Sequence, residues 1–70
     1  METKNEKFKR LANIRVNNAL KNLDLIGNLS NTNNYDFSSE EVRKIFNTLS
    51  VKMKDIQRKF SAGEDNKFNL

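Results

Sequence analysis

Hydrophobic positions recur at helical spacing in two segments of the chain, on either side of a polar, Asn-rich stretch. The first segment runs from Lys4 to about Ile26 and carries one apolar stripe whose residues are three or four positions apart. The apolar positions of the second segment fall within about a 100° sector and are spaced like the a and d positions of a short coiled coil. The pattern predicts an all-α fold, an antiparallel helical hairpin with helix one near 4–27 and helix two near 39–61. The first stripe comprises Phe8, Ala12, Val16, Ala19, Leu23 and Ile26, and the second comprises Val42, Ile45, Phe46, Leu49, Met53, Ile56 and Phe60.

The ends of helix two are marked by local signals. Ser38 followed by Glu41 has the spacing of a capping box, in which each side chain bonds the other residue's backbone N–H. Gly63 is a plausible residue to end the helix. We therefore expect residues 1–63 to form a single helical-hairpin domain, and residues 64–70, which show no periodicity, to form a flexible C-terminal tail.

Helix one has more apolar residues than a single stripe needs. The surplus lies on roughly the opposite side of the helix, and a helix that is apolar on two faces needs two neighbours. If helix two covers the first stripe, a symmetric copy of the chain is the simplest cover for the second face. This predicts a homodimer, a four-helix bundle with the first helices central, and the alternative is one hairpin docked on a larger protein. The expected dimer interface comprises Leu11, Ile14, Leu25 and Leu29.

The connection between the helices has two interpretations. Gly27 or Asn28 can adopt the left-handed conformation that ends a helix, and the polar residues 30–34 favour a turn. In this interpretation the segment is a corner between two helices. The alternative is a ligand-binding loop over Gly27–Phe37. Asp36, Glu40 and Glu41 give residues 28–41 a net charge of −3, so this end of the molecule would repel phosphate groups.

Composition narrows the chemistry of the chain. Its 70 residues allow at most one small domain, and it contains neither Cys nor His. Disulfides, thiolate metal sites and the commonest general base are therefore excluded, and the sequence has no Gly-rich phosphate loop. We expect no catalytic, cofactor-binding or metal-binding residues, no small-molecule substrate, no membrane segment and a cytoplasmic location.

Thirteen basic and nine acidic side chains give the chain a net charge of +4. Residues 42–60 carry six basic residues and one acidic residue, a local charge of +5. One face of helix two is made of hydrogen-bond donors and points away from the apolar seam. This basic face is open to three interpretations: the solvated side of an amphipathic helix, a phosphate-backbone contact, or a contact with an acidic protein surface. It comprises Arg43, Asn47, Ser50, Lys54 and Arg58.

The block IGNLSNTNNYDFSSEEVRKIF, Ile26 to Phe46, preceded by KRLANIRVNNAL, resembles a group of small uncharacterised bacterial, plasmid and phage proteins. They share an arginine-bearing helix, the "IGNLSN" block, an aromatic–polar–aromatic step, a Ser/Thr capping box and a second helix. The resemblance implies a small helical hairpin of mobile-element origin. It implies no mechanism, because the group has no assigned activity. We expect a non-catalytic protein–protein interaction module, an adaptor or inhibitor of a larger machine. The alternative is a nucleic-acid-binding accessory protein that contacts phosphates through the basic face.

Overall fold

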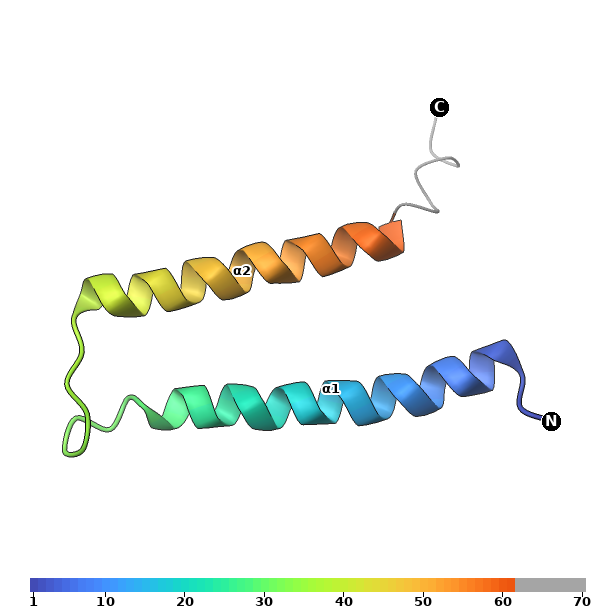
Figure 1. The fold of residues 1–70 in the computed structure, drawn as a ribbon, viewed down its shortest axis with the longest axis horizontal. Coiled ribbons are helices and arrows are strands. Elements are labelled where there is room, and N and C mark those ends of the chain that lie inside the picture. The colour runs from blue at the N-terminus through green and yellow to red at the C-terminus, as the bar shows by residue number, and fades with distance from the viewer. Residues whose placement is uncertain (62–70) are drawn as a thin grey trace, which may run out of the picture. The chain divides into compact units, whose positions relative to one another are not determined.

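The computed structural model describes residues 1–61, which form two α-helices and no strand (Figure 1). Helix α1 spans Lys4–Asn28 and helix α2 spans Ser39–Ser61. The chain divides into two units, residues 1–36 around α1 and residues 37–70 around α2. The all-α prediction is confirmed, and each predicted helix end agrees with the observed one to within a residue. The expected stop at Gly63 and the expected tail at 64–70 lie outside the described residues.

Helix α2 begins as the sequence predicts. The backbone N–H of Ser38 donates to Oε1 of Glu41 at 2.8 Å, and the N–H of Glu41 donates to Oγ of Ser38 at 3.1 Å. The two bonds satisfy backbone donors that the first turn of a helix leaves without intrahelical partners. Glu40 and Glu41 also place negative charge near the positive end of the helix dipole.

Helix α1 has a capping box of its own, which was not predicted. Oγ1 of Thr3 accepts from the N–H of Glu6 at 3.0 Å, and the N–H of Thr3 donates to Oε1 of Glu6 at 2.8 Å. The signal was present in the sequence, because Thr3 and Glu6 have the same spacing as Ser38 and Glu41. Both helices therefore start at a local motif that requires no tertiary contact.

The end of α1 differs from the prediction. Neither Gly27 nor Asn28 has a positive φ, and both belong to the helix. The capping residue is Leu29, with φ −69° and ψ −9°. The last carbonyls are satisfied by bonds between residues three apart: the N–H of Leu29 donates to the Ile26 carbonyl at 3.1 Å, and that of Ser30 to the Gly27 carbonyl at 3.0 Å. Tightening of the last turn thus replaces a left-handed cap.

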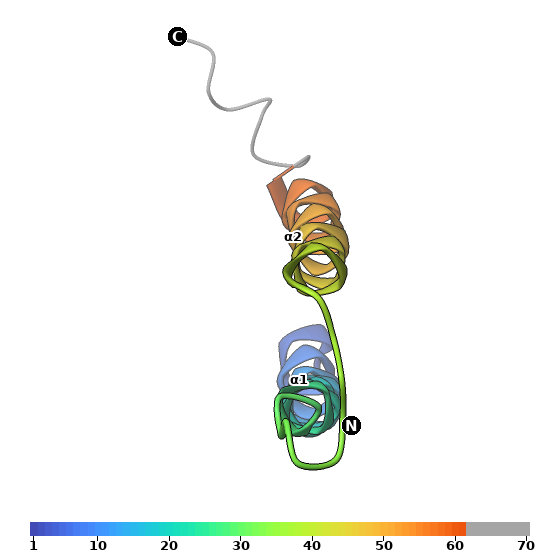
Figure 2. The same cartoon turned by 90° about the vertical axis from the view of Figure 1, so that its left-hand side faces the viewer.

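The connection between the helices is a turn built on Asn31 (green in Figures 1 and 2). Oδ1 of Asn31 accepts from the N–H of Asn33 at 3.0 Å, and its carbonyl accepts from the N–H groups of Asn34 and Tyr35 at 3.1 and 3.0 Å. An Asn side chain that bonds the backbone two residues on is a common way to stabilise a turn. The bonds favour the corner interpretation of this segment.

None of residues 1–61 is buried. A single helix covers only the backbone under its own side chains, so an amphipathic helix needs another surface to bury its apolar face. Capping motifs and apolar periodicity therefore specify helices α1 and α2, while the apolar face of each helix lies at the surface of its unit.

Candidate functional site

Helix α2 carries a complete heptad pattern, which we call the α2 seam. The six positions are apolar without exception, with spacings that alternate between four and three residues. In register, Phe46, Met53 and Phe60 occupy a positions, and Val42, Leu49 and Ile56 occupy d positions.

Four of the six residues of the α2 seam are exposed. Phe46 exposes 59% of its surface, Met53 54% and Ile56 42%, while Val42 and Leu49 are half-buried. Leaving an aliphatic or aromatic side chain in water forfeits about 1.5–3 kcal/mol relative to its full burial. A row of such residues on one face is the kind of surface that binds a partner. The unbroken helix brings all of them onto that face, as the sequence predicts.

The predicted basic face is also on α2. Its five residues all lie in the helix and are exposed, and the line from Arg43 to Arg58 is about 22 Å long at 1.5 Å per residue. These residues are Arg43, Asn47, Ser50, Lys54 and Arg58. The structure therefore brings together the donors that the sequence grouped on this face.

One end of the basic face is engaged in an ion pair that the sequence analysis did not include. Nη1 of Arg58 donates to Oδ1 of Asp55 at 2.7 Å, and the side chains are 74% and 45% exposed. An exposed pair of this kind contributes little to stability. The Asp55 carboxylate does partly neutralise Arg58, so the positive charge of the basic face is greatest around Arg43 and Lys54. The signal was the separation of three residues, which places two side chains together on a helix.

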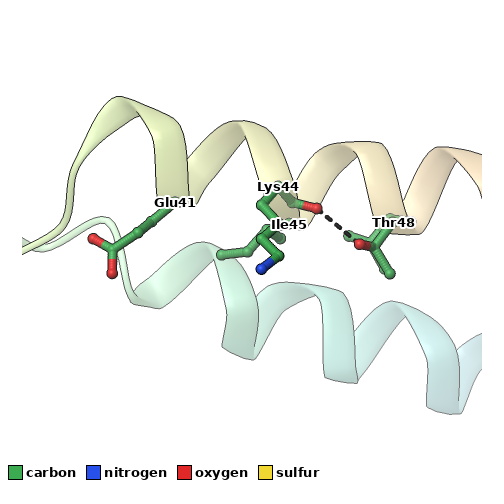
Figure 3. Close-up of a pocket in the computed structure, with 5 residues that line it drawn as sticks. Glu41, Lys44, Ile45 and Thr48 are labelled. Carbon is green, nitrogen blue, oxygen red and sulfur yellow. Dashed lines mark hydrogen bonds between the residues drawn. The ribbon is translucent and has the colours of Figure 1, made fainter.

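The other flank of α2 has shallow grooves between side chains. One is lined by Glu41, Lys44, Ile45, Thr48 and Leu49, four of which are labelled in Figure 3. The hydroxyl of Thr48 bonds back to the Lys44 carbonyl at 2.8 Å, so it is committed to its own helix. A small-molecule site usually encloses most of its ligand, whereas all of these residues come from one convex helix. The groove is part of the helix surface next to the seam.

The predicted dimer residues are only partly grouped by α1. Leu11 is half-buried, whereas Ile14, Leu25 and Leu29 are exposed by 50%, 62% and 44%. Leu29 lies at the cap, beyond the last helical residue. At 100° per residue the centre of Leu11, Ile14 and Leu25 lies about 120° from the stripe through Val16. The second face of α1 is therefore a neighbour of the first stripe and does not lie opposite it.

Arg10 of α1 is held by a residue that precedes the helix. Its Nε donates to Oε2 of Glu2 at 2.9 Å and its Nη2 to Oε1 at 3.1 Å, a two-point ion pair. The bonds to the carboxylate raise the pKa of the Arg10 guanidinium. Helical periodicity does not indicate this pair, because Glu2 lies before the first residue of α1.

The pKa values of the two capping carboxylates are also shifted. Hydrogen bonds from the Ser38 backbone and then from its hydroxyl lower the pKa of Glu41 below its ordinary value of 4.5. The same two bonds from Thr3 lower the pKa of Glu6. Each shift arises because the hydrogen bonds favour the ionised carboxylate, so both groups serve the helix starts.

The part of the chain that the structure describes holds no group of three or more acidic side chains placed to bind a metal ion. Over the same residues, neither helix is long and apolar enough to cross a membrane. No protein-family model, curated protein or solved structure matches the chain. The resemblance to small plasmid and phage proteins stays a prediction.

Proposed function

We propose that this chain is a non-catalytic protein–protein interaction module that acts as a helical dimer. The observation that carries the proposal is the α2 seam, a full set of apolar a and d positions of which four of six are exposed. An amphipathic helix with apolar anchors at i, i+3 and i+7 is a common element of helix-in-groove recognition. An adaptor or an inhibitor of a larger machine would use such a surface.

The dimer in this proposal rests on α1. Its first stripe and its second face together form an apolar surface wider than one helix covers. In the proposed bundle α2 packs on the stripe through Val16 and Leu23, and a second copy packs on Leu11, Ile14 and Leu25. The resulting four-helix bundle would bury apolar side chains that are exposed on each unit. A partner that binds the α2 seam therefore has to displace α1 from it.

The interaction is tested with two matched variants of the full chain. Leu49→Asp places a carboxylate in the α2 seam, whereas Val51→Asp makes the same change at a residue on the far side of the helix that is 60% exposed. Wild-type, Leu49→Asp and Val51→Asp chains are used as baits, and captured proteins are identified and then rebound in purified form. The proposal predicts a purified partner that binds the wild-type and Val51→Asp chains but does not bind the Leu49→Asp chain. Equal binding to all three chains would contradict it.

The charge of α2 favours a second candidate function, contact with a nucleic-acid backbone. The basic face could follow phosphates, and each neutralised phosphate would release counterions and make the affinity fall with salt. The test is a mobility-shift series with non-specific duplex at rising salt. This function predicts steep salt dependence and loss of binding in the variant Arg43→Glu/Lys54→Glu/Arg58→Glu. Absence of binding at about 50 mM salt would rule it out and leave the first candidate.

A further inference from the structure

The residues beside the α2 seam indicate which kind of protein binds there. In the same heptad register, the e positions are Arg43, Ser50 and Gln57, and the g positions are Ile45, Lys52 and Lys59. Arg43 and Ser50 are thus the edge of the basic face that borders the α2 seam, whereas its other residues point away from the seam. The e and g residues of a coiled coil lie against the partner and set its identity through charge. Both flanks of the α2 seam are therefore cationic or neutral, and neither has a carboxylate.

The acidic residues near the α2 seam are already engaged in local bonds. Glu41 accepts the Ser38 N–H at the helix start, and Asp55 accepts from Arg58 at 2.7 Å. Neither residue occupies an e or g position. The six basic residues against one acidic residue over 42–60 consequently leave an uncompensated positive field along the seam.

A second copy of α2 is a poor electrostatic match for this surface. Parallel or antiparallel pairing would bring e and g positions together, and these contain Arg43, Lys52 and Lys59 but no acid. Like charges across a helix pair are unfavourable. The charge pattern thus argues against the α2 seam as a self-association surface.

Helix α1 offers no better complement. With Val16 and Leu23 at a positions, its e positions are Asn13, Leu20 and Gly27, and its g positions are Phe8, Arg15 and Asn22. This set again lacks a carboxylate, and α1 as a whole has six basic residues against two acidic ones. Packing of α2 on α1 would therefore gain apolar burial without charge pairing.

We infer that the partner of the α2 seam is another protein with an apolar groove rimmed by acidic side chains. This inference rests on the proposed function and specifies its partner. Apolar anchors would enter the groove, and the rim carboxylates would face Lys52 and Lys59 on one flank and Arg43 on the other. Because α1 lacks such a rim, the acidic groove is the better charge complement for the α2 seam.

The test uses two synthetic helical peptides of equal length with the same Ile and Leu core. One peptide has Glu at every e and g position, and the other has Lys at all of them. Fluorescence anisotropy measures the Kd of each labelled peptide for the full chain at low and high salt. The Glu peptide should bind at least about tenfold more tightly than the Lys peptide, and the difference should shrink at high salt. Equal binding, or a preference for the Lys peptide, would overturn the inference.

Three variants of the full chain sharpen the test. Leu49→Asp should weaken binding of the Glu peptide at least about tenfold, whereas Val51→Asp, with the same change in net charge, should alter it less than about threefold. Lys52→Glu/Lys59→Glu should reverse the preference toward the Lys peptide. Circular dichroism confirms that each variant retains its helix content. If Val51→Asp weakens binding as much as Leu49→Asp, net charge alone explains the binding and the inference is wrong.

Competition separates an acidic protein groove from other anionic partners. Phosphatidylglycerol vesicles or duplex DNA, added at the same concentration of negative groups as the Glu peptide, should not displace it. Displacement by either one would overturn the inference in favour of a lipid surface or a nucleic acid. The bait experiment with purified partners fails or succeeds independently, so loss of the proposed function and loss of this inference give different results.

Discussion

At the scale of single residues, Thr3 and Ser38 have the same role at the two helix starts. Each hydroxyl accepts a backbone N–H three residues ahead, and each backbone N–H donates to a glutamate at 2.8 Å. Such motifs act within one turn of helix, so their effect does not depend on what the rest of the chain contacts.

Replacing Ser38 by Ala should destabilise the start of α2 by about 0.5–2 kcal/mol, because the N–H of Glu41 loses its acceptor. The neighbouring Ser39→Ala is the matched control, since Ser39 is the first residue inside the helix and does not accept that bond. Backbone chemical shifts over residues 39–46 and the far-ultraviolet circular dichroism report the change. Equal loss of helix in both variants would show that Ser38 has no special role.

Acid should weaken the same helix start. The folded-state pKa of Glu41 is below its ordinary value of 4.5, so its contribution to helix stability is complete above that value. The contribution is lost as the pH falls below about 4.5 and through the lowered pKa. Glu41→Gln should remove this acid dependence from the shifts of residues 39–42, measured by nuclear magnetic resonance. An unchanged acid response in Glu41→Gln would place the titration on another group.

At the scale of elements, apolar periodicity and capping residues determine where each helix forms. Where a helix ends depends on the backbone conformation at its last residues. Gly27 is the clearest case. It lies inside α1 without a positive φ, and an added Cβ would meet no atom within 4 Å. Glycine in a helix costs backbone entropy, and nothing within the described chain requires it here.

Gly27→Ala should therefore stabilise the end of α1 by about 0.8–1 kcal/mol. Higher helicity by circular dichroism and greater amide protection of residues 25–29 would confirm the expectation. The conservative comparison is Asn28→Ala, which also replaces a residue of the last turn but does not relieve a glycine. A loss of helicity in Gly27→Ala alone would show that something approaches Gly27 closely, as in the binding-loop interpretation of this segment.

At the scale of the whole molecule, the chain shows apolar faces that need covering. Residues 1–61 include no buried side chain, although 36% of the sequence is hydrophobic. A chain shorter than about 70–80 residues that lacks disulfides and metals seldom supplies enough core by itself. Burial of these apolar faces on assembly is therefore expected to contribute most of the free energy that stabilises the fold.

The homodimer predicts that Leu25→Asp yields monomer or unfolded chain, because a carboxylate would be placed in the interface between the two α1 helices. Asn17→Asp is the control, since it adds the same charge at an exposed polar residue of α1 that belongs neither to the stripe nor to the second face. Sedimentation velocity at micromolar concentration, together with circular dichroism, measures both variants. A wild-type chain that sediments as a folded monomer would contradict the dimer.

Much of the candidate site was predictable from the sequence. The a and d spacing of Leu49, Met53 and Ile56 and the grouping of Arg43 with Lys54 both follow from a period that an uninterrupted helix preserves. The ion pair between Asp55 and Arg58 was not included, because it depends on side-chain conformations chosen after the helix forms. The same holds for Glu2 and Arg10, whose contact needs the chain before α1 to fold back along the helix.

The two helices and their faces follow from the amino-acid sequence, because hydrogen bonding and capping within a helix are set by residues three or four apart. The sequence did not fix the connection: the structure shows that α1 continues through Gly27 and Asn28 to a cap at Leu29, and that Asn31 holds the turn. Glycine permits left-handed and right-handed backbone at similar cost and asparagine tolerates both, so the local hydrogen bonds make that choice. The structure also shows Met53 and Ile56 exposed on α2, because one helix cannot bury its own apolar face.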